Sequence, residues 1–88
     1  MKKNVVGGRV QHARTAQSIS QKDLSNRLLS SQGISISEDG IQRLEQGQRK
    51  VSDIELLAIA AVLRVNPGWL LGQGTLKGLI WNTNSEDS

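Results

Sequence analysis

The 88-residue chain contains no cysteine and only one histidine. Without cysteine it forms no disulfide and no thiolate metal site, so a packed core alone must hold the fold, which suits a reducing cytosol. A single histidine provides no zinc site, and His12 is interpreted as a surface or structural residue. A chain of this length supports one domain with a modest core.

Long apolar runs and catalytic signatures are also missing. Val5 and Val6 lead straight into Gly7, Gly8 and Arg9, so we expect neither a signal peptide nor a membrane span. We therefore expect a cytoplasmic protein. These glycines lack the spacing and the lysine of a phosphate loop, and no serine has a base arranged beside it. We therefore expect no enzyme, no cofactor and no small-molecule ligand.

Positive charge predominates over most of the chain. Residues 1–81 carry 11 basic and 6 acidic side chains, a net charge of +5, whereas the polar segment 82–88 is acidic. This excess favours a polyanionic partner through release of counterions, although many basic proteins bind no anion. The segment 82–88 has no apolar anchor and is expected to be a disordered tail.

Apolar spacing, serine caps and glycine stops together predict five helices, and no segment alternates like a strand. Ser20, Ser37 and Ser52 are interpreted as N-caps, and Ser52 opens a full capping box. The predicted helices cover about 6–17, 21–32, 38–46 and 53–65, with a short fifth over 68–71 after Asn66-Pro67. Gly33, Gly47 and Gly72 are expected to close the second, third and fifth helices.

Apolar residues at spacings of three and four predict the inner side of each helix. The fourth helix has the strongest pattern, through Ile54, Leu57, Ala58, Ala61 and Val62. For the others, the predicted inner residues are Val6, Val10, Ala13, Ala16 and Gln17, then Leu24, Leu28 and Leu29, then Ile41, Leu44 and Glu45, and finally Trp69, Leu70 and Leu71. A further apolar cluster, Leu76, Leu79, Ile80 and Trp81, lies in an extension over residues 75–81.

Several motifs occur in a fixed order along these helices. They are Gly8-Arg9-Val10 and Arg14, then the segments 20–24 (SQKDL), 41–47 (IQRLEQG) and 65–72 (VNPGWLLG). Together they resemble the phage repressor and Cro family of DNA-binding domains, also called the xenobiotic-response-element (XRE) family. The resemblance implies an all-α, compact five-helix, lambda-repressor-like domain over residues 1–74, whose second and third helices form a helix-turn-helix.

One departure from the family is a long connector between the second and third helices. Most members have a tight turn containing glycine there, whereas this chain has about six more residues. We expect the extra length to extend the second helix to Gly33 and to let Ile34 and Ile36 pack across the connection. The connector affects the angle of the third helix and thereby the positions of Glu38 and Asp39.

The resemblance also implies roles for individual residues. The third helix is expected in the major groove of double-stranded DNA, where an arginine fork suits guanine. Its implied base-reading residues are Glu38, Asp39, Gln42 and Arg43. The implied phosphate contacts are Ser20, Gln21 and Lys22 before and within the second helix, and Gln48, Arg49 and Lys50 after the third. Arg14 and Glu45 are implied to be a structural ion pair.

Other interpretations of these residues stay open. Arg43 could contact a phosphate or point into solvent, and residues 48–50 could be a solvated basic turn. Glu38 and Asp39 could simply complement the dipole of their helix. The extension could pack on its own domain or meet a second subunit, and we favour a homodimer, at least on DNA.

The sequence therefore predicts a sequence-specific DNA-binding transcriptional regulator, of which a repressor is the favoured form. Negative charge at Glu38 and Asp39 motivates an alternative, because acidic groups repel phosphates. In that alternative the same scaffold is a protein-interaction module such as an antitoxin or an adaptor.

Overall fold

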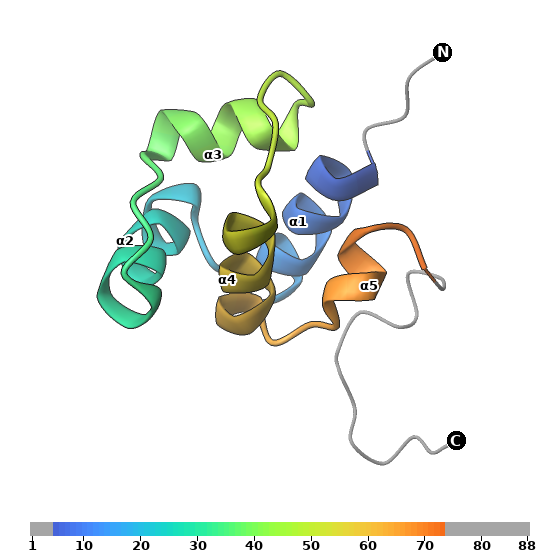
Figure 1. Ribbon diagram of the computed structural model, residues 1–88. Helices are drawn as coiled ribbons and strands as arrows, with labels where there is room; N and C mark the ends of the chain where they lie inside the picture. The colour runs from blue at the N-terminus through green and yellow to red at the C-terminus, as the bar shows by residue number, and fades with distance from the viewer. Residues whose placement is uncertain (1–4, 74–88) are drawn as a thin grey trace.

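The computed structural model describes residues 5–73, which form five α-helices and no strand (Figure 1). The helices are α1 (Val5–Ala16), α2 (Gln21–Gln32), α3 (Glu38–Glu45), α4 (Asp53–Leu63) and α5 (Pro67–Leu70). The predicted all-α, five-helix class is thereby confirmed. The apolar cluster of the extension and the polar tail lie outside the described residues.

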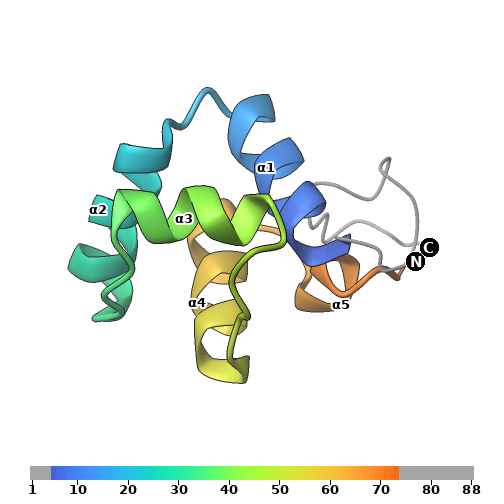
Figure 2. The ribbon, with the colours of Figure 1, turned by 90° about the horizontal axis from the view of Figure 1, so that it is seen from above.

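Helix α3 lies across one outer face of the domain, with the other helices behind it (Figures 1 and 2). It packs against α1 and α2, while α4 packs against α1, α2 and α5, and α5 also contacts α1. Seen from above, α3 crosses in front of the rest of the molecule (Figure 2). One side of α3 therefore meets the core and the opposite side is left to solvent.

The core lies where these helices meet, and each of them contributes to it. Its largest fully buried side chains are Val10, Leu24, Leu28, Ile41, Leu44, Ile59, Leu63, Val65 and Leu70. The connector contributes as predicted, because Ile36 is buried and Ile34 packs partly against the core. Burial of each large apolar side chain favours folding by about 1.5 to 3 kcal/mol.

The helix ends follow the predicted caps. The side chains of Ser20, Ser37 and Ser52 each accept a hydrogen bond from the backbone N–H three residues later. Gly33 ends α2 in the left-handed region at a φ of 67°, which costs a glycine little, and its N–H bonds to the α2 carbonyls. Helix α4 ends differently, since Arg64 takes the left-handed conformation with a φ of 60°.

The predicted inner side of α4 is wrong at most positions. Ile54 and Leu57 are 68% and 57% exposed, Ala61 is exposed, and Val62 is only partly buried. The buried residues of the helix are Leu56, Ala58, Ile59, Ala60 and Leu63. Because nearly every residue of α4 is apolar, the spacing rule fits several sides and does not select one. Helix α4 therefore presents apolar side chains to solvent as well as to the core.

Smaller errors have a geometric cause. Leu29 and Leu71 are 59% and 61% exposed, because each follows a buried leucine and neighbours on a helix point about 100° apart. In α1, Ala16 and Gln17 are exposed, since the helix ends at Ala16 and its inner side runs through Gly7, Val10, Ala13 and Arg14 instead.

Candidate nucleic-acid interface

Helix α3 is fixed to the domain by one side. Ile41 and Leu44 are buried there, together with Glu45, which is 5% exposed. The four predicted base-reading residues, Glu38, Asp39, Gln42 and Arg43, are all exposed. Their spacing places them on the opposite side of the helix, so the structure brings them together on one outward surface. We call this set the α3 surface.

Gly40 has a role in positioning α3 that sequence reasoning missed. A Cβ atom at this position would lie 3.0 Å from Cγ2 of Ile36 and 3.7 Å from Nε of Arg49. The missing side chain lets Ile36 of the connector approach the helix closely, whereas the distance to Arg49 is an ordinary van der Waals contact. The start of α3 is therefore packed tightly against the connector.

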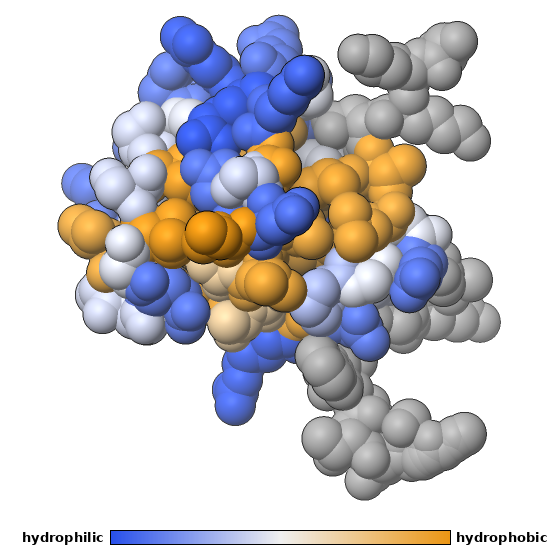
Figure 3. All heavy atoms as spheres, in the orientation of Figure 1, coloured by the Kyte–Doolittle hydropathy of each residue, from blue (hydrophilic) through white to orange (hydrophobic). Residues whose placement is uncertain are grey.

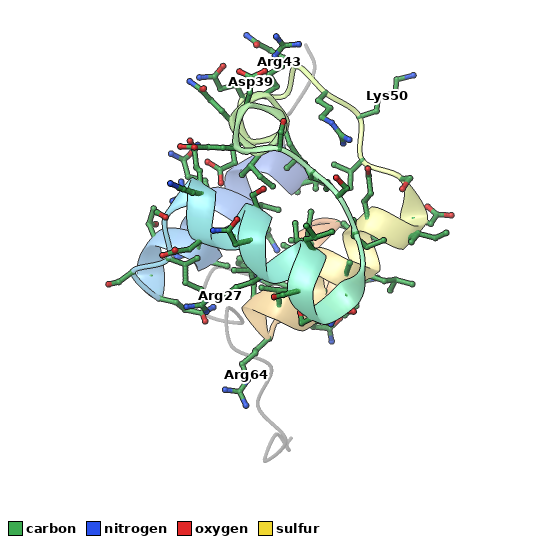
Figure 4. The ribbon with its side chains drawn as sticks, turned by 90° about the vertical axis from the view of Figure 1, so that its left-hand side faces the viewer. Arg27, Asp39, Arg43, Lys50 and Arg64 are labelled. Carbon is green, nitrogen blue, oxygen red and sulfur yellow. The ribbon has the colours of Figure 1, made fainter. Side chains whose placement is uncertain are left out.

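An ion pair joins two residues of the α3 surface. The Nε atom of Arg43 lies 2.9 Å from Oδ2 of Asp39, one turn earlier, and both side chains are more than half exposed (Figure 4). Such an exposed pair contributes little to stability. Its consequence is geometric, because the contact occupies Nε and leaves the two terminal nitrogens of Arg43 for another partner.

A buried network connects α3 to α1 and α2. Arg14 donates from Nε to Oε2 of Glu45 at 2.6 Å and from Nη2 to Oε1 at 2.9 Å. Its remaining Nη1 donates to the carbonyl of Ile19 at 2.9 Å. The amide of Gln21 donates to Oε1 of Glu45 at 3.0 Å, so one carboxylate fixes the start of α2 and the end of α3 relative to α1.

A second ion pair organises the loop between α3 and α4. Arg49 donates to both carboxylate oxygens of Glu55, at 3.0 and 2.9 Å, and to the carbonyl of Lys50. These bonds from Arg49 lower the pKa of the Glu55 carboxyl to about 2, against the effect of partial burial, and the backbone N–H of Ser52 assists them. The guanidinium of Arg49, implied by the resemblance to contact phosphate, thus already has a carboxylate partner.

This pair predicts a pH-dependent contribution to stability. Because the pKa of Glu55 is lowered from 4.5 to about 2, its contribution is complete above pH 4.5 and is lost as the pH falls through 2. We expect the loss to be about 1 to 2 kcal/mol after solvent screening. Urea unfolding between pH 2 and 6 should show a shallower acid decline for Glu55→Gln than for the wild type. Asp53→Asn keeps the pair and should retain the wild-type slope; identical slopes for all three proteins would contradict the assignment.

The remaining predicted phosphate contacts lie at two places. Ser20 and Lys22 are exposed at the start of α2, beside the half-buried Gln21, and Gln48 and Lys50 are exposed in the loop after α3. Lys50 lies at the same end of the domain as the α3 surface, whereas Arg27 and Arg64 project from other parts (Figure 4). The candidate phosphate contacts beyond the α3 surface are thus Lys50 and the N-terminus of α2.

Two kinds of site are not found in residues 5–73. No group of three or more histidine or carboxylate side chains in this range could hold a metal ion. None of the helices described is long and apolar enough to cross a membrane.

The fold and the α3 surface define a helix-turn-helix domain, in which α2 and α3 are joined by a connector and α3 is presented outward. A family model described as helix-turn-helix matches residues 10–70. No curated protein and no solved structure matches the chain. The chain belongs to this helix-turn-helix family, the XRE type that its motifs resemble, and is a DNA-binding transcription regulator.

Proposed function

We propose that the protein binds double-stranded DNA sequence-specifically by inserting α3 into the major groove, and that it represses transcription by occupying an operator. The observation that carries this proposal is the α3 surface, which projects from an outer face while its opposite side is anchored by Ile41, Leu44 and Glu45. A rigidly held, exposed helix is the element that a major groove admits.

Arg43 is the proposed principal base-reading residue. Its terminal nitrogens suit the O6 and N7 atoms of guanine, and Asp39 would orient the fork through Nε. The same ion pair compensates the charge of Asp39, which reduces the repulsion expected between an acidic side chain and phosphates. Glu38 and Gln42 would contact neighbouring bases, Glu38 by accepting from a cytosine amino group.

Phosphate contacts would fix the position of α3 in the groove. Gln21 is proposed to bind a phosphate at the N-terminus of α2, where backbone N–H groups favour anions, with Ser20 and Lys22 beside it. Gln48 and Lys50 would contact the backbone on the other side of α3. Because Arg49 is held by Glu55, we assign it mainly to shaping this loop.

Two copies are proposed to bind one operator. Operators with two-fold symmetry match proteins that present one reading helix per subunit, about one helical turn of DNA apart. We place this regulator in the cytoplasm.

Selection of bound fragments from random duplex DNA tests the proposal most directly. We expect a palindromic sequence containing guanine in each half-site, and binding that weakens steeply with salt. Recovery of no sequence preference, together with salt-insensitive retention on heparin, would contradict DNA binding and favour a protein-interaction module that uses Glu38.

Lys50→Ala should weaken binding to all duplexes by a similar factor. A lysine on a phosphate releases about one counterion, so the slope of log affinity against log salt should fall by about one unit. Arg27→Ala removes the same charge away from the α3 surface and should leave the slope unchanged (Figure 4). Fluorescence anisotropy over a salt series measures both; equal effects of the two substitutions would contradict a specific contact at Lys50.

A further inference from the structure

An apolar groove lies between α4 and α5, apart from the α3 surface. It has a volume of about 260 Å³ and is lined by Leu57, Ala60, Ala61, Arg64, Val65 and Pro67. Five of these six residues are apolar, and Leu57 is 57% exposed. Hydrophobic side chains gather on the face of α4 that is turned to the viewer in Figure 3. Covering the groove with an apolar segment would remove this surface from water, which favours such docking.

The last described residue, Gln73, is hydrogen-bonded to a residue of α5 that adjoins the groove lining. The backbone N–H of Gln73 donates to the carbonyl of Gly68 at 3.0 Å, and Gly68 directly follows Pro67 of the groove. Arg9 fixes this exit, because its Nη1 donates to the carbonyls of Gln73 at 2.9 Å and Trp69 at 2.8 Å. Gln73 is thereby held beside Gly68 of α5, the residue that follows Pro67 of the groove.

The segment that follows has the chemistry and the length to cover the groove. Leu76, Leu79, Ile80 and Trp81 begin three residues after Gln73, which corresponds to a reach of at most about 10 Å to the first of them. From Leu57 to Arg64 the groove wall extends about 10 Å along α4, a distance that six extended residues exceed. Glu86 and Asp87 follow the apolar cluster in sequence, and their negative charge is complementary to the positive charge of Arg64, which lines the groove.

We infer that residues 76–81 dock into the α4–α5 groove of their own subunit. A tether this short gives the segment an effective concentration in the millimolar range, so its own subunit is favoured over a second copy in dilute solution. The inference assigns the apolar cluster to its own domain, and two-fold binding to DNA would then use other surfaces. It rests on the groove and the chain exit and is independent of DNA binding.

Cross-linking tests the docked position, because the natural chain has no cysteine and two introduced thiols form a single possible intramolecular pair. Ala61→Cys combined with Gly78→Cys should oxidise at low micromolar concentration to a disulfide-linked monomer. Gln42→Cys with Gly78→Cys, whose first thiol lies on α3, should oxidise at least tenfold more slowly. A mainly dimeric product from the first pair would place the segment in a second copy and overturn the inference, and so would equal rates for the two pairs.

Tryptophan quenching provides a second test that needs no cross-link. Trp69 is 3% exposed and is therefore protected from acrylamide. Quenching of tryptophan fluorescence by acrylamide should then report on Trp81. Leu57→Asp should raise the quenching constant of the accessible component several-fold. Leu29→Asp is a matched control, because Leu29 is 59% exposed but does not line the groove. If Trp81 were as accessible in the wild type as in Leu57→Asp, the inference would be wrong.

Discussion

Replacement of Glu45 by alanine is expected to lower the free energy of unfolding by about 3 kcal/mol, because it leaves the guanidinium of Arg14 buried without its carboxylate. Arg14 and Glu45 are only 8% and 5% exposed, so water does not replace the lost partner easily. The substitution also removes the acceptor of the Gln21 amide. For a small domain this loss is a large fraction of the total stability.

A double-mutant cycle separates the pair from other effects of truncation. Glu45→Ala, Arg14→Ala and the double variant should be compared by urea unfolding, and the double variant should lose less than the sum of the single losses. The exposed pair of Asp39 and Arg43 is the control, since its cycle should give an interaction below about 1 kcal/mol. Additive losses at Arg14 and Glu45 would show that the pair contributes nothing beyond its separate side chains.

The fold was predictable because its helix ends are encoded locally. A serine that accepts from a backbone N–H three residues later marks the start of α2, α3 and α4, and a glycine in the left-handed region marks the end of α2. These signals depend only on neighbours in sequence. The end of α4 lacked such a signal, because Arg64 takes the conformation that glycine usually provides.

Which side of α4 is buried could not be predicted, and the reason is physical. A hydrophobic pattern selects a side only when polar residues mark the other, and α4 has few polar residues after its first turn. The side that packs inward is decided by contact with α1, α2 and α5. The result is the exposed position of Leu57 and, with it, one wall of the α4–α5 groove.

The exposure of the α3 residues was predictable from the sequence, but the contacts around them were only partly so. Sequence reasoning selected the exposed residues of α3, but it did not find the partners Glu55 for Arg49 or Glu45 for Gln21. The pair of Asp39 and Arg43 was within reach of the sequence, because acidic and basic residues four apart on a helix lie next to each other. Gly40 was not, since its significance depends on how closely Ile36 approaches.

Arg43→Ala is expected to reduce affinity for the best DNA site by about 1 to 3 kcal/mol, the discrimination that one bidentate contact with guanine provides. The loss should be concentrated at one base pair in each half-site, where the variant should accept other bases. The fold should be unaffected, because the side chain is 62% exposed and its ion pair with Asp39 is on the surface. Asp39→Ala should cause a smaller loss at the same base pair, since the fork remains but is no longer held at Nε.

The possible roles of Arg43 can be distinguished by measuring binding to a set of duplexes. Each duplex carries one base-pair substitution at one position of the site. A base contact predicts that Arg43→Ala flattens the preference at one position and leaves the others as in the wild type. Lys50→Ala serves as the comparison, because loss of a phosphate contact weakens every duplex alike. If Arg43→Ala behaved in the same way as Lys50→Ala, Arg43 would be a phosphate contact. The recognition of bases would then depend on Glu38, Gln42 and Asp39, the other residues of the α3 surface.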